Sequence, residues 1–467
     1  MKIALPKGRF LGETAALLQR AGLGLDGYHE KARLYRFKSQ SFPNLSIKMF
    51  HEKDIPIQVA VGNYDLGICG LDWVEELLYK YPSSALVKVK NLRYGKGVLY
   101  MVGGQSDSGA SLEQIKGRAG VVRITSEYPN LAESFALRNR LSRFSVFPVW
   151  GGAEAYPPDD AEMALISWGK GLKASGMVPI SRVLNYSAFL IANKKSWKAK
   201  GLHDVVAAIA DNLPAVERKS SESGFTVSAG APAAFMKTDE SLVRLALPDG
   251  HQQKPTLALL NRAGIQIDDY PSAEGNRRPK IGIEGVAVKV IRPQDMPLQV
   301  ANGNFDIAIT GHDWVTEHLN QFPSSPVKEL LDLKHGKVRI VAVTSEELPV
   351  TDIAGLRQLR AEQLAPLRVA SEYVNIADRY ARDNHLGHYR VVPTWGATEA
   401  FLPEDADLLI ENTETGQTIA RHNLRIIDTI FESAACLVGN SGIDYDSVKG
   451  KIVKSIVDSL RDAVGGQ

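Results

Sequence analysis

Short apolar runs alternate with segments of helical spacing along this chain, and the alternation predicts an α/β fold with largely parallel sheets. Residues 12–21 place their apolar side chains on one helical face, and residues 73–78 begin a second helix with Asp72 at its N-cap. The predicted strands are residues 2–5, 65–69, 98–102, 164–166, 338–343 and 408–410. Ligands of such folds bind beyond the carboxyl ends of the strands, so candidate chemistry is expected there.

The same pattern occurs twice in the chain. Residues 53–74 recur as residues 294–315, at an offset of 241 positions. Three further matches keep the same order, namely residues 3–8 with 245–250, 123–130 with 368–375, and 150–155 with 395–400. Collinear matches whose offset drifts by only a few residues indicate a tandem duplication of a unit of roughly 220 residues.

Each copy ends in a segment with the apolar spacing of an amphipathic helix, at residues 206–213 and 452–464. After the first of these segments, small and polar residues with glycine and proline are typical of a linker. The predicted domains are therefore a first unit at 1–218, a linker at 219–241 and a second unit at 242–467.

The composition of the chain mainly excludes classes of protein and kinds of site. The chain has 55 Lys and Arg residues against 53 Asp and Glu residues, and this balance gives no support to a nucleic-acid or membrane-surface role. No apolar run approaches the roughly 20 residues of a membrane span, and the polar turn of the N-terminus does not fit a signal peptide. Two cysteines cannot make a disulfide framework or a cysteine-rich zinc site. A soluble, cytoplasmic protein is expected.

The segment 405–419 carries the clearest candidate chemistry. An apolar strand ends in acidic residues and leads into Thr415-Gly-Gln-Thr418, where Gly416 permits a tight turn. Consecutive amide groups and the two threonine hydroxyls suit a phosphate, and Glu411 can accept hydrogen bonds from sugar hydroxyls. The pattern favours a phosphorylated ribose, and the alternative interpretation is a solvated turn with an ordinary helix cap.

Two further segments offer charged groups beside glycines. Lys7 and Arg9 surround Gly8 directly after the first strand, which suits either a polyphosphate or an exposed basic turn. Asp72 and Asp313 each precede Trp-Val, and we interpret them first as helix N-caps and second as ligand contacts.

Glu154 and Glu399 each follow a Trp-Gly turn, and they are either general acid–base groups or ordinary surface carboxylates. The ten histidines show no metal-ligand spacing, so a zinc site is not expected. The sequence also lacks a nucleophile elbow, a Walker-type phosphate loop and a dinucleotide fingerprint.

Taken in order, these segments resemble ATP phosphoribosyltransferase, the first enzyme of histidine biosynthesis. The likeness covers most of both copies and rests on Ile3-Ala-Leu-Pro-Lys-Gly-Arg, Asp54-Ile-Pro with Asp65-Leu-Gly-Ile-Cys-Gly, Ser126-Glu-Tyr-Pro-Asn, and Glu414-Thr-Gly-Gln-Thr with Phe431-Glu-Ser-Ala-Ala-Cys-Leu. It implies tandem two-lobed units like type II periplasmic binding proteins. The implied lobes are about 1–95 plus 179–218, 96–178, about 242–335 plus 425–467, and 336–424.

The resemblance implies attack of the adenine N1 of ATP on the anomeric carbon of phosphoribosyl pyrophosphate, with release of pyrophosphate. Such a reaction needs positioning and cationic clamps more than a covalent nucleophile. It also implies Mg²⁺ carried by the substrate phosphates, without direct protein ligands. The implied catalytic residues are Arg9, Arg33, Arg292 and Glu399, the ATP-binding residues Lys7, Gly8, Arg9 and Asp313, and the phosphoribosyl pyrophosphate-binding residues Glu411, Glu414, Thr415, Gly416, Gln417 and Thr418.

The two copies depart from the family pattern at different places. The first keeps Lys7 and Arg9, but residues 166–171 replace the phosphate loop with a shorter segment that lacks the carboxylates. The second keeps the loop, but Asp249 and His251 replace the two cations, and an aspartate beside a triphosphate is repulsive. Neither copy alone carries a complete site.

Because family members act as dimers, the tandem chain is expected to be a covalent pseudo-dimer, with a higher homo-oligomer left open. We expect one site on the Glu411–Thr418 loop with Arg292, reached from the first unit by Lys7, Arg9 and Arg33. Two alternatives stay open, an inactive ligand-binding or regulatory paralogue and a phosphoribosyltransferase for another heterocyclic acceptor. The sequence gives no clue to histidine feedback or to a regulatory partner.

Overall fold

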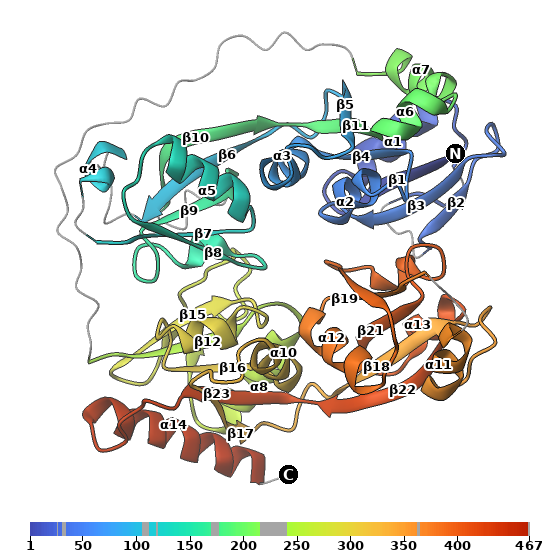
Figure 1. Ribbon diagram of the computed structural model, residues 1–467. Coiled ribbons are helices and arrows are strands. Elements are labelled where there is room, and N and C mark those ends of the chain that lie inside the picture. Colours follow the sequence, from blue (N-terminus) through green and yellow to red (C-terminus); the bar gives the residue numbers. More distant parts are fainter. Residues whose placement is uncertain are drawn as a thin grey trace.

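The chain folds as two tandem units, each with two sheets, in a computed structural model (Figure 1). The structure describes residues 1–467 except 26, 30–33, 105–111, 118–119, 170–176, 215–240, 362–364 and 466–467. Almost all of the linker predicted at 219–241 therefore lies outside the described residues. We name the four lobes I and II in the first unit and III and IV in the second.

Lobe I is a six-stranded sheet in the order β2-β3-β1-β4-β11-β5. β1 is parallel to β3 and β4, whereas β11 returns antiparallel to β4 and β5. The strands are β1 (Lys2–Lys7), β2 (Arg36–Lys38), β3 (Ser46–His51), β4 (Leu66–Gly70), β5 (Leu86–Asn91) and β11 (Ala188–Asn193). The helices are α1 (Leu11–Arg20), α2 (Asp54–Ala60), α3 (Leu71–Lys80), α6 (Lys194–Ala199) and α7 (His203–Asp211).

Lobe II is a five-stranded sheet in the order β10-β6-β9-β7-β8. Its elements are β6 (Gly97–Gly104), α4 (Leu112–Lys116), β7 (Val122–Ser126), α5 (Pro129–Arg138), β8 (Phe144–Pro148), η2 (Ala153–Ala155), β9 (Met163–Ser167) and β10 (Met177–Tyr186). The strands β8 and β9 both pair parallel with β7.

Lobe III repeats the topology of lobe I in the order β15-β12-β16-β23-β17. Its elements are β12 (Val243–Pro248), η4 (Gly250–Gln252), α8 (Gln253–Arg262), β13 (Ile267–Asp268), β14 (Lys280–Ile281), β15 (Val286–Ile291), α9 (Met296–Ala301), β16 (Ile307–Gly311), α10 (His312–Gln321), β17 (Val327–Asp332), β23 (Ala435–Asn440) and α14 (Val448–Gly465). The short β13–β14 hairpin is a separate pair.

Lobe IV repeats lobe II in the order β20-β19-β21-β18-β22. Its elements are β18 (Val338–Ser345), α11 (Ile353–Ala361), β19 (Leu367–Ser371), α12 (Val374–Asp383), β20 (Tyr389–Pro393), η5 (Thr398–Phe401), β21 (Leu408–Thr413), α13 (Gln417–Arg421) and β22 (Leu424–Ser433). The predicted α/β class, the duplication and the predicted strands and helices are confirmed. The repeated topology is that of a type II periplasmic-binding-protein unit.

Three details differ from the sequence-based expectations. In each lobe at least two strand pairs are antiparallel, so the sheets are mixed and the expectation of largely parallel sheets is wrong. Asp72 and Asp313 are not N-caps: Gly70 and Gly311 precede α3 and α10, and the aspartates lie inside the first helical turn with buried carboxylates. The chain returns to lobes I and III after β10 and β22, near residues 187 and 434, rather than at 179 and 425. The later return occurs because both ten-residue strands pair antiparallel with β6 and β18 along their whole length.

The units pack crosswise, so that lobe I faces lobe IV and lobe II faces lobe III (Figure 1). We name these two contacts crossover A (lobes I and IV) and crossover B (lobes II and III). Each has an apolar core formed by both units; in crossover A the rings of Phe50 and Phe401 meet edge to face at 5.2 Å. Because apolar burial drives such packing, the two crossovers hold the pseudo-dimer together.

Candidate functional site

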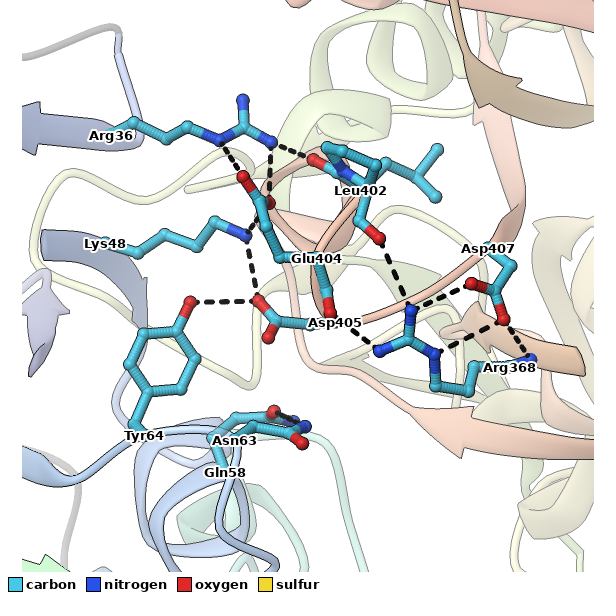
Figure 2. Close-up of polar contacts among 11 residues, drawn as sticks. Arg36, Lys48, Gln58, Asn63, Tyr64, Arg368, Leu402, Glu404, Asp405 and Asp407 are labelled. Atoms are coloured by element: carbon cyan, nitrogen blue, oxygen red, sulfur yellow. Dashed lines mark hydrogen bonds and ion pairs between the residues drawn. The ribbon is translucent and has the colours of Figure 1, made fainter. Parts of the chain in front are cut away.

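Crossover A is fastened by a buried ion-pair cluster, shown in Figure 2. Lys48 on β3 places Nζ 2.7 Å from a carboxylate oxygen of Glu404 and 2.8 Å from Asp405, and its side chain is only 4% exposed. Tyr64 donates its hydroxyl proton to Asp405 at 2.9 Å. Arg36 donates hydrogen bonds to both carboxylate oxygens of Glu404 and to the carbonyl oxygen of Leu402. These contacts fix β3 of the first unit against the turn before β21.

A platform of two stacked rings lies beside this cluster. Tyr35 from the first unit and His422 from the second have ring centroids 4.8 Å apart at an angle of 30°. Lys7 donates to the Tyr35 hydroxyl at 3.4 Å, and its ammonium lies 5.2 Å from the centre of the same ring. Burial and the nearby cations Arg36, Arg421 and Lys7 lower the pKa of His422 despite an opposing carboxylate, Glu399.

Three carboxyl groups of lobe IV converge next to the platform. Burial and the neighbouring carboxylates of Glu372 and Glu399 raise the pKa of Glu411 well above its ordinary value. Burial and Glu399 also raise the pKa of Glu372 to about 7. Burial with Glu399 and Glu411 raises the pKa of Tyr35 to about 12, which places the tyrosine within reach of both carboxylates. Burial and the mutual repulsion of these carboxylates therefore favour the protonated forms of Glu411 and Glu372.

The Thr413–Thr418 loop continues from β21 at this edge. The hydroxyl of Thr413 accepts a hydrogen bond from the amide of Gly416 at 2.9 Å, and Thr415 accepts from Gln417 at 3.4 Å. Gly416 has a φ of 77°, a left-handed conformation that glycine adopts without strain. Thr415, Gln417 and Thr418 are exposed at the turn into α13, so their polar groups are open to a ligand.

Glu414 points to a different space from Glu411. It lines a cavity of about 500 Å³ between lobes III and IV, together with His312, Lys337, Arg339 and Glu432 among others. The loop therefore lies between crossover A on one side and the cleft of the second unit on the other.

The predicted cations of the first unit separate in the structure. Lys7 faces the second unit through Tyr35 and His422, whereas Arg9 stays within its own unit. Arg9 donates to Glu52 at 2.8 Å and to Asp72 at 2.6 Å, and its guanidinium lies 4.5 Å from the Phe10 ring centre. The expectation that Arg9 reaches across the interface is wrong, because these two carboxylates of lobe I hold it in place. Gly8, with a φ of 96°, supplies the turn between the two cations, and Arg33 lies outside the described residues.

Asp313 is also held within its own unit. Its carboxylate accepts hydrogen bonds from Tyr373 at 2.6 Å and from Ser433 at 2.9 Å, and the residue is 5% exposed. Asp72 makes the equivalent contact with Tyr128 at 2.8 Å. These aspartates join the two lobes of each unit, and the Asp313 carboxylate already accepts two hydrogen bonds from its own unit.

Arg292 lies at crossover B and not beside the Glu411 loop. It stands 3.6 Å from Asp249, and a Cβ added to Gly151 would lie 3.0 Å from its Nε. The predicted combination of Arg292 with the second unit's loop is therefore not what the structure shows. The reason is the crosswise packing: residues at the end of β15 meet lobe II of the first unit, not lobe IV.

At crossover B, ion pairs between side chains occupy the place that is accessible in crossover A. Arg277 occupies the position that Tyr35 has in crossover A, and it pairs with Asp249 at 2.6 Å and with Glu154 of the first unit at 3.4 Å. Ile166 pairs with Tyr100 in the sheet as Glu411 pairs with Val341, so an apolar side chain replaces the key carboxylate. Among the described residues, crossover B therefore has no counterpart of Glu411 or of the Tyr35–His422 stack, although Glu127 and Glu154 keep the positions of Glu372 and Glu399.

Sequence reasoning missed Tyr35, His422, Lys53 and Glu372. Glu372 lies in the recurring Ser-Glu-Tyr segment, so the repeat offered a signal for it. Lys53, whose counterpart is Gln294, pairs with Glu127 at 2.9 Å and lowers the raised pKa of Glu372. Tyr35 and His422 lie 387 positions apart and had no pattern to join them.

A fully buried carboxyl group near the centre of the molecule gives a testable pH dependence. Asp295 accepts the amide of Trp150 at 3.0 Å, and burial with the nearby Glu127 carboxylate raises its pKa to about 8, against the opposing effects of this hydrogen bond, Lys53 and Arg292. The unfolded chain ionises this group near pH 4 but the folded chain does so near pH 8, so its contribution to stability declines as pH rises through that window.

Asp295→Asn keeps an acceptor for Trp150 and removes the titration. We expect wild type and variant to have similar urea midpoints near pH 4.5, with the variant more stable by about 1–3 kcal/mol at pH 9. Equal pH profiles for the two proteins would show that Asp295 titrates normally.

The described residues contain no group of three or more His, Cys, Asp or Glu side chains arranged to hold a metal ion. Among the described helices, none is both long and apolar enough to cross a membrane.

Fold and site together define a duplicated, two-lobed α/β protein with an anion-suited loop and a carboxylate cluster at one of two crossed interfaces. Comparison with known proteins narrows this class. The family described as "HisG: ATP phosphoribosyltransferase" matches the chain twice, at residues 51–215 and 292–462. The chain belongs to the ATP phosphoribosyltransferase family.

Individual relatives match about one unit of the chain. An ATP phosphoribosyltransferase of Koribacter versatilis is 32% identical over 225 residues, covering 48% of this chain and 74% of the relative. One from Chlorobaculum parvum is 31% identical over 237 residues, covering 50% and 75%. Among solved structures, a chain of the ATP phosphoribosyl transferase (HisG:HisZ) complex from Thermotoga maritima aligns with a TM-score of 0.39 and 22% identity, over 48% of this chain and all of that one.

Proposed function

We propose that this chain is an ATP phosphoribosyltransferase that acts in the cytoplasm through a single composite site at crossover A. Family membership supports the activity. The observation that supports the location is the pairing of lobe I with lobe IV, because it brings Lys7 and Tyr35 next to His422, four residues beyond the Glu411–Thr418 loop. At crossover B the corresponding places are taken by Asp249, Arg277 and Ile166.

In this proposal the loop receives phosphoribosyl pyrophosphate. The hydroxyls of Thr415 and Thr418 and the turn at Gly416 surround the 5-phosphate, while Glu411 accepts hydrogen bonds from the ribose hydroxyls. Lys7, from the first unit, faces the ATP and balances the charge of its phosphates. Binding the two reactants in one rigid interface converts their encounter into an oriented step.

The bond from adenine N1 to the anomeric carbon forms as the bond from that carbon to the pyrophosphate oxygen breaks. The adenine ring, once alkylated, gives up a proton, and a carboxylate must be near to take it. Glu372 is the acceptor proposed within the Glu372, Glu399 and Glu411 cluster, because its pKa of about 7 allows proton exchange at neutral pH. Glu399, the residue singled out from the sequence, is the member of the cluster that acts on both Tyr35 and His422.

Mg²⁺ fits the proposal as a partner of the substrate phosphates. The described residues offer no metal-binding cluster of their own, and Mg²⁺ in nucleotide sites commonly keeps its waters and binds through phosphates. When bound there it supplies charge neutralisation for the departing pyrophosphate.

The test is product formation by the purified full chain. With ATP, phosphoribosyl pyrophosphate and Mg²⁺, mass spectrometry should detect phosphoribosyl-ATP and an equal amount of pyrophosphate, and excess EDTA should abolish both. Binding of both substrates without turnover at high enzyme concentration would identify an inactive paralogue. Product formation with another heterocycle but not with ATP would reassign the acceptor.

A further inference from the structure

The stacked pair of Tyr35 and His422 is the most distinctive part of crossover A that the proposed reaction does not yet use. The rings come from different units, lie 4.8 Å apart at 30° and are each only partly buried. Partly exposed aromatic rings held face to face leave ring surface for a further flat ring. No carboxylate is hydrogen-bonded to either ring among the contacts of the described residues, so neither is committed to a structural ion pair.

Two cations flank this pair without being bound into the ion-pair cluster of Figure 2. The ammonium of Lys7 lies 5.2 Å from the centre of the Tyr35 ring. Arg421 ends α13 next to His422, is exposed, and acts electrostatically on the histidine. Arg36, the third cation near His422, pairs with Glu404 and belongs to the ion-pair cluster of crossover A. Lys7 and Arg421 remain for a ligand.

The acidic cluster borders the same rings. Glu399 acts on Tyr35 and on His422, and Glu411 acts on Tyr35. An aromatic ring stacked here would have its edge near carboxylates that accept hydrogen bonds from an exocyclic amine, and its phosphates near Lys7 and Arg421. This combination matches an aminopurine nucleotide rather than a sugar phosphate.

The equivalent place in crossover B is occupied by an ion-paired arginine. Arg277 replaces Tyr35 and is bound by Asp249 and Glu154. The same fold position is thus a closed ion pair in one crossover and an accessible ring in the other. A purely structural role would be served by either solution, so the retained ring points to a function at crossover A.

We propose that the Tyr35–His422 pair is the platform on which the purine of the acceptor ATP stacks, with Lys7 and Arg421 holding its phosphates. The inference rests on the proposed function and assigns the acceptor to residues from both units. Tyr35 is then a positioning residue that the first unit provides to a site built on the second. Phosphoribosyl pyrophosphate, held by the Thr415–Thr418 turn, does not contact it.

The test separates the two substrates. Stacking of a base on an aromatic side chain has an effect equivalent to roughly 10- to 100-fold in affinity. In the full chain, Tyr35→Ala should raise the KM for ATP by about that factor and change the Kd for phosphoribosyl pyrophosphate less than about twofold. Tyr35→Phe keeps the ring and should keep the KM for ATP near that of wild type. Arg277→Ala, at the matched position of crossover B, should leave the KM for ATP unchanged.

Calorimetric titration with ATP alone keeps this inference apart from the proposed activity. Weaker ATP binding by Tyr35→Ala than by Tyr35→Phe supports the platform even if the wild-type protein forms no product. In that case the proposed enzymatic activity is overturned, but the proposed ATP-binding platform is not. Equal ATP affinity in wild type, Tyr35→Phe and Tyr35→Ala would overturn the platform, whether or not the enzyme turns over. Urea midpoints of the variants confirm that folded proteins are being compared.

Discussion

Replacing Thr415 and Thr418 together with valine will lower kcat/KM for phosphoribosyl pyrophosphate by at least about 100-fold. Both hydroxyls are exposed on the turn at Gly416, where the proposed 5-phosphate binds. A hydrogen bond to a charged group is worth about 1.5–3 kcal/mol, and valine keeps the shape of threonine while removing the donor. Steady-state kinetics at saturating ATP measure the loss.

The matched control is the double replacement by serine. Thr415→Ser with Thr418→Ser keeps both hydroxyls, so kcat/KM should stay within a few-fold of wild type. Equal kinetics in the valine and serine proteins would remove this loop from the phosphate site. The two threonines face solvent, so neither replacement is expected to change the urea midpoint.

Lys48→Ala will destabilise the folded chain by about 3–5 kcal/mol, because it leaves the Asp405 carboxylate buried without its counter-ion. The Asp405 side chain is 0% exposed and has only Tyr64 as a further hydrogen-bond donor within the cluster of Figure 2. The lost ion pair joins the two units, so the units should also separate more readily. Urea unfolding followed by intrinsic fluorescence measures the effect.

An exposed lysine provides the comparison. Lys88 pairs with Glu75 at 2.6 Å, but its side chain is 42% exposed, and such pairs contribute about 0–1 kcal/mol. Lys88→Ala should therefore shift the midpoint little. If both alanine variants lost the same small amount, crossover A would owe its strength to the apolar core around Phe50 and Phe401 rather than to the buried charges.

Local pattern was sufficient for much of the fold. Strand and helix periods located some of the strands and helices of both units, and the recurrence of residues 53–74 revealed the duplication. The reason is that these features depend on neighbouring residues: β1 and α1 follow from the alternation of apolar and polar positions within about 20 residues.

The site could be predicted only in part, because its geometry depends on contacts between distant segments. Arg36 and Glu404 are 368 positions apart, and nothing in either neighbourhood indicates the partner. Arg9 was expected to cross the interface, but Glu52 and Asp72 bind it first. Arg292 was assigned to the wrong crossover, since sequence does not show which lobe a strand end will face.

The two crossovers carry different residues at matched positions, and this difference agrees with a single working site. Crossover A keeps Lys7, Glu411 and the threonine turn, whereas crossover B has Asp249 and Ile166 at the first two positions and the ion pairs of Arg277 in place of the Tyr35 ring. Its pairs of Lys289 with Asp159 and Asp160, at 2.7 and 2.5 Å, repeat the fastening of crossover A. The second interface has kept its packing role and lost the groups that would bind substrate.

The number of phosphoribosyl pyrophosphate molecules bound per chain tests the single composite site most directly. Isothermal titration of the full chain in the presence of Mg²⁺ should give one molecule per chain, and the valine double variant at Thr415 and Thr418 should abolish that binding. Two equivalent molecules per chain, or one that persists in the valine variant, would contradict a single site on this loop.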